Sequence, residues 1–441
     1  MKISILTLFP ELYQPFINTS LMRRAQEKDL VHFDVESMFA LAQPKERIDG
    51  PTFGHGPGLV LRPDIVEKGI KQQEAKFGKS VKIFFSPHGK KLNQDTLSEI
   101  YQKIEQSRGK HCCLLPARYE GMDARLEEHY ADEVVSIGDY VLMGGDLPAM
   151  VLLEGLLRFV PGVVGKAASV TEDSFSGPLV DYPHYTAPVE WKGYTVPSVL
   201  RSGNHAKIAQ WRKEQSVDRT VYGHFDWLRS HAEAVEVKEV VREELPSHYA
   251  ALLHTGVLQQ DGSEGTTSVT SIDIHDVARS AATFGLSHYY VVTSLLDQQK
   301  IVQRLLEFWQ AGGPGETYNV KRFQALEEVS LKASLQQAID DIVKREGQRP
   351  IIIGTSAREV EGKENITYYE QKKVWQRNRP VLMLFGTGSG LGPSIIQECD
   401  YILLPVHGFS SFNHLSVRSA AAIVLDRWLG INIKYKKRQD S

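Results

Sequence analysis

The sequence has little cysteine, no long hydrophobic run and no large excess of charge. Its three cysteines among 441 residues, Cys112, Cys113 and Cys399, form no Cys-x-x-Cys pair. This excludes a disulfide scaffold or a zinc knuckle and is typical of buried thiols in a reducing cytoplasm. Apolar runs such as 151–153 are far shorter than the roughly 20 residues that cross a bilayer. The apolar N-terminal stretch also lacks a small-residue cleavage site. We therefore expect a cytoplasmic protein without a membrane partner.

The balance of charge excludes a chain that is attracted to nucleic acid over its whole surface. The 51 basic and 54 acidic residues give a net charge of −3, so any RNA-binding site must be a local patch. Residues 201–219 contain five basic and two acidic side chains and are the best candidate for such a patch. We expect no DNA partner.

Length and hydrophobic patterning predict an α/β protein of two or more domains. At roughly 100–200 residues per domain, 441 residues suit two or three domains. Short apolar runs alternate with helical patterns in both halves, which favours mostly parallel sheets with helices on both faces. The expected strands are 3–9, 32–38, 81–85, 112–115, 134–137, 291–292, 351–353, 381–385 and 401–404. The expected helices are 12–28, 94–107, 148–159, 204–219, 226–244, 297–310, 331–345 and 414–429.

Three glycine-rich loops are candidate ligand sites, because ligands of parallel sheets bind at the carboxyl ends of the strands. They are residues 54–58, 138–145 and 386–392. None has the G-x-G-x-x-G spacing of a dinucleotide site or the G-x-x-x-x-G-K-[ST] spacing of a P-loop. No G-x-S-x-G or H-E-x-x-H motif is present either. The spacing therefore argues against a nucleotide-dependent oxidoreductase or a hydrolase.

The first 220 residues or so contain a series of short motifs in a fixed order. They include Leu8-Phe9-Pro10-Glu11, Ser86-Pro87-His88-Gly89, Arg118-Tyr119-Glu120-Gly121, Ser136-Ile137-Gly138-Asp139-Tyr140-Val141-Leu142, Leu147-Pro148-Ala149-Met150, Thr171-Glu172-Asp173-Ser174-Phe175 and Ser202-Gly203-Asn204-His205. In this order they resemble the bacterial tRNA (guanine-N1)-methyltransferases, which methylate the guanosine on the 3′ side of the anticodon. The resemblance implies the SPOUT class of α/β fold, with a deep trefoil knot, S-adenosylmethionine (SAM) as cofactor and a homodimer as the active form.

The resemblance also assigns a cofactor site to the first half of the chain. The residues that match the family's SAM-binding positions are Phe85, Ser86, Pro87, Ala117, Tyr119, Glu120, Gly121, Ser136, Ile137, Gly138, Tyr140, Leu142, Gly144, Gly145 and Pro148. Ala117 departs from the family, which has glycine there, and so places a methyl group near the cofactor. His55 likewise replaces a glycine in the 54–58 loop.

Two further matches imply the chemistry. N1 of guanine carries a proton at neutral pH, so a base must remove it while charge on O6 is stabilised. Asp173 matches the family's general base and Arg158 the arginine on the O6 side. The structural alternatives are a carboxylate that caps a turn and an exposed helix arginine. Family members are reported to need Mg²⁺, for which Glu120 and Asp173 are the candidate ligands.

RNA contacts are implied at five positions. Asp49, Lys91, Ser169, Asn204 and His205 match tRNA-contacting positions of the family. Residues 50–52 depart from the acidic and basic pair that follows Asp49 in the family, which puts that contact in doubt. A non-catalytic tRNA-binding protein is the rival interpretation, and it predicts the loss of Asp173 or Arg158. Both residues are present.

The last third of the chain resembles a second SPOUT module, similar to predicted RNA methyltransferases. The motifs are Leu384-Phe385-Gly386-Thr387-Gly388, Asp400-Tyr401-Ile402-Leu403-Leu404-Pro405 and Asn413-His414-Leu415-Ser416-Val417-Arg418. Gly386, Gly388, Leu404 and Leu415 would line a second SAM site. Arg418 or Asn413 could serve a reaction, and no base is assigned. A non-catalytic dimerisation or tRNA-docking module is the alternative.

We therefore expect two SPOUT-type domains with parallel sheets and deep trefoil knots, joined by a small helical tRNA-binding segment. The predicted boundaries are 1–160 for the first methyltransferase domain and 161–203 for a connector at its active site. Residues 204–245 form the basic helical segment, and 246–441 the second domain.

Overall fold

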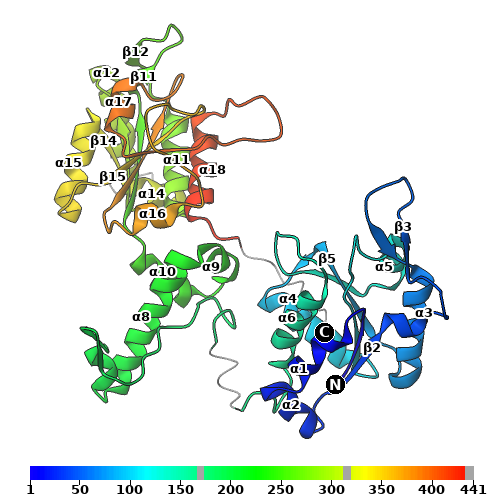
Figure 1. The fold of residues 1–441 in the computed structure, drawn as a ribbon. Coiled ribbons are helices and arrows are strands. Elements are labelled where there is room, and N and C mark those ends of the chain that lie inside the picture. Colours follow the sequence, from blue (N-terminus) through cyan, green and yellow to red (C-terminus); the bar gives the residue numbers. More distant parts are fainter. Residues whose placement is uncertain (166–172, 311–318, 433–441) are drawn as a thin grey trace. The chain divides into compact units, whose positions relative to one another are not determined.

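The computed structural model describes residues 1–165, 173–310 and 319–432. The chain divides into two compact units, residues 1–176 and 177–441, and each is described by itself (Figure 1). No helix among the described residues is long and apolar enough to span a membrane. The three cysteines are free and buried, as expected, and burial raises the pKa of Cys112 to about 12.

A five-stranded parallel sheet forms the centre of the first unit. Its strand order is β2-β1-β6-β5-β7, and every pairing is parallel, which confirms the predicted architecture. The strands are β1 Lys2–Thr7, β2 His32–Ser37, β5 Val81–Lys91, β6 His111–Leu115 and β7 Glu133–Ser136. A small antiparallel hairpin, β3 Asp49–Pro51 and β4 Leu59–Leu61, carries the 54–58 loop.

Helices cover both faces of this sheet, because alternate strand residues point to opposite sides. Ile3, Ile5 and Ile83 pack with α4 and α6 in one cluster, whereas Leu6 and Phe84 pack with α3 in another. The helices are α1 Tyr13–Ile17, α2 Ser20–Glu27, α3 Pro63–Phe77, α4 Gln94–Gln106, α5 Ala124–Tyr130 and α6 Asp146–Leu157, with short 3₁₀ turns at Pro10–Leu12 and Met38–Leu41.

The structure differs from the expected helices at two places in this unit. The predicted helix over 12–28 is interrupted, because Thr19 is extended and Ser20 has a φ of +50°. The long helix α3 was not predicted, although Pro63 at its first turn and Gly78 at its end are ordinary helix boundaries.

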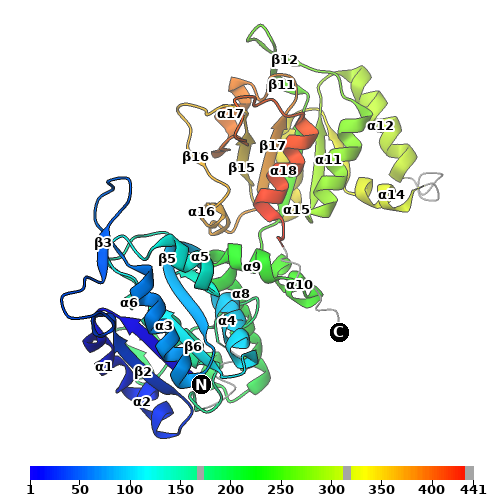
Figure 2. The ribbon, with the colours of Figure 1, turned by 90° about the vertical axis from the view of Figure 1, so that its right-hand side faces the viewer.

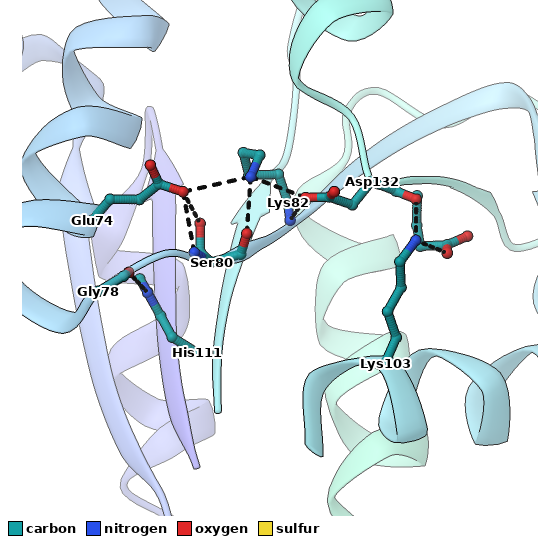
Figure 3. Close-up of polar contacts among 8 residues, drawn as sticks. Glu74, Gly78, Ser80, Lys82, Lys103, His111 and Asp132 are labelled. Carbon is teal, nitrogen blue, oxygen red and sulfur yellow. Dashed lines mark hydrogen bonds and ion pairs between the residues drawn. The ribbon is translucent and has the colours of Figure 1, made fainter. Parts of the chain in front are cut away.

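Polar side chains join the amino ends of the strands (Figure 3). Lys82 at the start of β5 lies 3.0 Å from the Asp132 carboxylate and 3.4 Å from that of Glu74. The Ser80 hydroxyl donates to Glu74 at 3.1 Å, and Lys103 donates to the backbone carbonyl of Asp132 at 2.7 Å. Because ligands of parallel sheets bind at the opposite, carboxyl edge, we assign this network a structural role.

The second unit contains a seven-stranded sheet in the order β14-β13-β10-β17-β15-β18-β16, again parallel throughout. Its strands are β10 His248–Leu253, β13 His288–Val292, β14 Val329–Lys332, β15 Ile351–Thr355, β16 Asn365–Ile366, β17 Val381–Gly386 and β18 Tyr401–Leu403. A hairpin of β11 Thr255–Leu258 and β12 Glu264–Thr266 follows β10.

This sheet is also covered on both faces (Figure 2). One face packs against α11 Ser271–Thr283, α12 Leu296–Gln310, α14 Val320–Glu327, α16 Gln371–Trp375 and α18 Val417–Leu429. The other packs against α15 Leu335–Glu346 and α17 Pro393–Glu398. The start of the predicted helix 331–345 is instead the end of β14, and Ser334 caps the helix that follows.

The helical segment belongs to the second unit by its packing. It consists of α8 His205–Gly223, α9 Phe225–His231 and α10 Val235–Glu244. Val217, Val221 and Leu228 are buried in the same cluster as the sheet of this unit. The Arg229 guanidinium donates to the backbone carbonyls of Asp426, Arg427 and Gly430 at 2.5–3.0 Å, and so caps the end of α18.

The segment before these helices, residues 177–203, contains little regular structure, as its composition predicted. It has a two-residue-per-strand hairpin, β8 Glu190–Trp191 and β9 Tyr194–Thr195, and a 3₁₀ turn at Ser198–Arg201. The four segment boundaries predicted from the sequence stay a prediction.

Candidate active sites

Three loops meet at the carboxyl edge of the first sheet. Residues 86–89 form a bulge in β5, because Phe85 and Lys90 both pair with Val135 of β7. The loop after β6 is joined to the loop after β7 by a hydrogen bond from Gly145 N to Ala117 O at 2.7 Å. A backbone bridge between Arg118 and Gly144 strengthens this junction.

Every predicted SAM-binding residue of the first half lies on one of these loops or on the helix that follows them. The bulge and the residue before it contain Phe85, Ser86 and Pro87. The loop after β6 contains Ala117, Tyr119, Glu120 and Gly121. The end of β7 and the loop after it contain Ser136, Ile137, Gly138, Tyr140, Leu142, Gly144 and Gly145, and Pro148 lies in the first turn of α6. The structure brings them to one edge, and their contact with a cofactor stays a prediction.

The junction of the two longer loops requires a glycine. A Cβ atom on buried Gly145 would lie 2.9 Å from both the Ala117 nitrogen and the Pro116 Cα. Real Cβ atoms essentially never approach backbone so closely, so a larger residue here would push the loops apart. This glycine therefore fixes the position of the loop that contains Tyr119 and Glu120.

A partly buried ion pair that the sequence analysis did not identify supports the same junction. The Arg118 guanidinium lies 2.8 Å from the buried Asp146 carboxylate, which also accepts hydrogen bonds from Thr7 at 2.6 Å and Tyr13 at 3.1 Å. Burial and the nearby Asp146 carboxylate raise the pKa of Tyr13 above its usual range, so its hydroxyl remains a donor. Asp146 was missed because an acidic residue in the first turn of a helix reads as an ordinary helix start.

The two predicted catalytic side chains contact each other. Arg158 directly follows α6, and its Nη2 forms an ion pair with Oδ2 of Asp173. Both side chains are partly exposed, at 45% and 40%. The pair thus presents a carboxylate and a guanidinium to solvent at one place, which is the combination that the predicted proton removal requires.

The predicted magnesium ligands do not form a metal site. Within the described ranges, no group of three or more His, Cys, Asp or Glu side chains is placed to hold a metal ion. Asp173 is paired with Arg158, and Glu120 lies against Gly58, where a Cβ atom would be 2.4 Å from its carboxylate oxygen. The described residues therefore do not fit Mg²⁺.

The predicted tRNA-contacting residues lie on several elements. Asp49 in β3 accepts two hydrogen bonds from Arg47, and Lys91 at the end of β5 forms an ion pair with Asp139. The Asn204 side chain caps α8 by accepting from the Lys207 nitrogen at 3.1 Å, and the neighbouring His205 is exposed. Ser169 lies outside the described residues.

The second unit has a cavity at the carboxyl edge of its sheet. Gly386, Gly388, Leu404 and Leu415, the four predicted residues, all line this cavity of about 710 Å³. A Cβ atom on Gly386 would lie 2.6 Å from Gly390 C and Leu391 N, so the loop after β17 can fold this tightly only with glycine. The structure therefore brings together three short motifs that are spread over residues 384–418.

Other residues of this cavity were not predicted. They come from the 267–273 segment before and within α11 and from the loop after β15. Thr267 and Thr387 are hydrogen-bonded at 2.5 Å, and His254 Nδ1 lies 3.1 Å from the Thr267 hydroxyl. Burial lowers the pKa of His254 to about 4, so it is neutral near pH 7. The sequence analysis missed Asp273 as a site residue, because Thr270-x-x-Asp273 is typical of a capping box at the start of a helix. Thr270 does cap α11.

Two protein-family models match successive parts of the chain. The model described as tRNA (Guanine-1)-methyltransferase TrmD matches residues 1–230. The model described as SAM-dependent RNA methyltransferase matches residues 247–430. The first match therefore includes α8 and most of α9, although these helices pack in the second unit.

Relatives named tRNA (guanine-N(1)-)-methyltransferase fall into two lengths. The protein of Nitratidesulfovibrio vulgaris is 40% identical over 98% of this chain and 99% of its own length, and that of Oleidesulfovibrio alaskensis 37% identical over 98% and 99%. The protein of Bacillus licheniformis is 39% identical over 98% of its own length but only 55% of this chain. The chain belongs to the tRNA (guanine-N1)-methyltransferase family and carries a SAM-dependent RNA methyltransferase domain in its C-terminal half.

Proposed function

We propose that the first domain transfers a methyl group from SAM to N1 of the guanosine 3′-adjacent to the anticodon of tRNA. The pairing of Asp173 with Arg158 is the observation that carries this proposal. Family membership supports the reaction and the tRNA substrate. A cytoplasmic location is part of the same proposal.

The pair can perform the two tasks that the reaction sets. An ion pair contains an ionised carboxylate, and that is the form of Asp173 that can accept the N1 proton of guanine. Arg158 beside it can donate hydrogen bonds to O6, where negative charge grows as the proton leaves. SAM supplies an electrophilic methyl group when bound. The guanine must insert between the two side chains, which exchange their mutual contact for contacts to the base.

The three loops at the carboxyl edge of the first sheet form the proposed cofactor site. Their mutual hydrogen bonds and the close contact at Gly145 support a preformed cradle of backbone groups. We include the deep trefoil knot of the SPOUT class in this proposal, and the helical segment 204–245 as the part that holds tRNA. Its predicted +3 charge patch lies largely on α8.

An unusually apolar surface supports a homodimer. Large apolar side chains on the loop after β7 and the exposed side of α6 face solvent in the single chain. They are Tyr140, Val141, Leu142, Met143, Leu147 and Val151. Contiguous exposed apolar side chains are typical of interaction surfaces. A second copy of the chain would cover these residues and enclose the proposed cofactor site.

The second domain, on this proposal, also binds SAM, in the 710 Å³ cavity that its four predicted residues line. The alternative of a docking or dimerisation module with an empty cavity makes a different prediction for cofactor stoichiometry. Calorimetry on the intact protein should find two SAM molecules per chain if both domains bind the cofactor. A single site would favour the docking module.

The first domain's reaction is tested by methyl transfer from labelled SAM to unmodified tRNA with guanosine beside the anticodon. We expect Asp173→Asn to lower the rate about 10²–10⁴-fold, because the base is removed, with SAM affinity unchanged. Glu27→Gln is the matched control, since Glu27 forms an exposed ion pair with Arg23 on α2. An Asp173→Asn protein that forms N1-methylguanosine at the control's rate would exclude Asp173 as the base.

A further inference from the structure

The cavity of the second domain contains a carboxylate and a guanidinium that contact each other. Asp273 in the first turn of α11 and Arg418 in the first turn of α18 both line it, together with Gly386 and Gly388. Oδ1 of Asp273 lies 3.2 Å from Nε of Arg418. The two residues are far apart in sequence, and only the packing of α11 against α18 brings them together.

Asp273 is the carboxylate of this cavity that is held in place. Its side chain is 15% exposed, and Oδ2 accepts a hydrogen bond from the Thr270 hydroxyl at 2.6 Å. Glu359, the other acidic residue of the lining, is exposed on the loop after β15. A proton acceptor must be oriented towards its substrate, and that requirement favours the fixed carboxylate.

Arg418 also contacts a second carboxylate, which provides an internal comparison. Its Nη1 lies 3.5 Å from Oδ2 of Asp276, one turn further along α11. Asp276 is not part of the cavity lining. If Arg418 only connects α11 to α18, replacing either aspartate should have a similar effect. If the contact serves a reaction in the cavity, only replacement of Asp273 should matter.

We propose that Asp273 is the proton acceptor and Arg418 its positioning partner in a second methyl transfer, carried out in this cavity on RNA. The inference rests on the proposed cofactor site of the second domain. The pair of Asp273 and Arg418 has the same two side-chain types as the pair of Asp173 and Arg158 in the first domain, at different places in the fold.

The acceptor of this reaction is an RNA nucleotide whose nucleophilic atom, a ring nitrogen or a ribose oxygen, carries a proton at neutral pH. Its lone pair forms the bond to the methyl carbon, and the electron pair of the breaking carbon–sulfur bond returns to the SAM sulfur. The proton of the nucleophile passes to the Asp273 carboxylate. S-adenosylhomocysteine and methylated RNA are the products, so no further reactant is needed.

The test uses the full chain with the first site disabled by Asp173→Ala. Labelled SAM is supplied with total RNA from cells in which the gene has been deleted, and methylated nucleosides are identified after digestion. We expect label in RNA at a position other than N1 of the anticodon-adjacent guanosine. Adding Asp273→Asn should lower the rate of this transfer about 10²-fold or more. The SAM affinity of the second site should stay within about twofold of that of the Asp173→Ala protein. Base-methylated and ribose-methylated products distinguish the two acceptor classes.

Asp276→Asn, in the same Asp173→Ala background, is the matched control and should retain the transfer rate within about threefold. Equal losses in both aspartate variants, or loss of SAM binding with Asp273→Asn, would indicate a structural role and overturn the proposal. Loss of methyl transfer with Glu359→Gln but not with Asp273→Asn would indicate that Glu359 is the proton acceptor. A protein that binds two SAM molecules yet methylates no RNA in the Asp173→Ala background would overturn it too, while leaving the cofactor site intact.

Discussion

Arg158 and Asp173 are fifteen residues apart, and their contact contributes little to folding. Ion pairs between partly exposed side chains typically stabilise a protein by about 0–1 kcal/mol. Stability therefore does not explain why a carboxylate and a guanidinium share this place. The proposed proton removal from guanine would explain it, because that reaction needs an acceptor for the proton and a cation for the charge that remains.

His248 is a buried residue whose titration should affect folding. Its Nε2 accepts hydrogen bonds from the indoles of Trp375 and Trp428, each at 3.1 Å, and its Nδ1 lies 2.6 Å from the Pro246 carbonyl. Nδ1 therefore carries the proton, and a second proton on Nε2 would face two N–H donors. Burial lowers the pKa of His248 to about 4.

This lowered pKa predicts a loss of stability in acid. The unfolded chain binds a proton at His248 below pH 6.5, whereas the folded chain does so only near pH 4, so unfolding becomes easier as the pH falls through this window. We expect the contribution to reach about 3 kcal/mol between pH 7 and pH 4. Urea unfolding at several pH values measures it.

His248→Gln is the comparison protein, because the glutamine amide reaches the Nε2 position and does not titrate. Its unfolding free energy should fall less steeply between pH 6.5 and 4 than that of the unmodified protein. Parallel pH profiles would show that His248 is not the responsible group. Other buried histidines with lowered pKa values, such as His254 and His111, contribute equally to both proteins and cancel.

At the scale of elements, the ends of strands decide where ligands can bind. In both units the loops that follow parallel strands lie side by side, and glycines at Gly145 and Gly386 permit backbone contacts that a side chain would block. The same type of loop junction therefore occurs twice on one chain. Helix α18 begins directly after such a loop and carries Arg418 in its first turn, whereas Arg158 follows the opposite end of α6.

Gly386→Ala should disrupt the second cofactor site alone. Its new methyl group would lie 2.6 Å from the backbone of Gly390 and Leu391, so the loop must open. Calorimetry should show one SAM molecule per chain instead of two. Gly408→Ala is the control, since a Cβ atom there has its nearest neighbour at 4.0 Å. If Gly386→Ala still binds two SAM molecules with unchanged affinity, this loop is not part of the site.

At the scale of the molecule, the helical segment and the second domain share one hydrophobic core. Val217, Val221 and Leu228 are each at most 2% exposed, and Arg229 caps α18. The match to the first family nevertheless extends to residue 230. The helices proposed to hold tRNA are therefore part of the compact unit that contains the second methyltransferase domain.

The shared core predicts how fragments of the chain behave. Residues 177–441 should fold as a unit with a cooperative unfolding transition. Residues 246–441 lack Val217, Val221 and Leu228, each of which contributes about 1.5–3 kcal/mol when buried, and should be less stable by about 5 kcal/mol or more. Chemical denaturation of both fragments measures the difference. Equal stabilities would mean that the helical segment folds independently.

Local patterns were sufficient for all five strands of the first sheet, whereas β10, β14 and β16 of the second sheet and helices such as α3 and α11 were not predicted. Apolar runs such as 351–353 and 381–385 are buried on both faces of a parallel sheet, so they can be recognised as strands from the sequence alone. The break within 12–28 and the strand at the start of 331–345 were not predicted, because the backbone conformations of Thr19 and of the β14 residues depend on tertiary packing. The proposed catalytic residues and the predicted cofactor residues of the first half were identified from short motifs, because each motif is contiguous.

The sequence by itself determined the α/β class, the family and the residues of its motifs, because hydrophobic periodicity and contiguous motifs are local properties of a chain. Only the tertiary structure decided which distant side chains meet. Asp146 with Arg118, Asp273 with Arg418 and the helical segment with the second domain are contacts between elements remote in sequence. Such contacts depend on how helices pack across a sheet, and no local pattern of residues encodes that geometry.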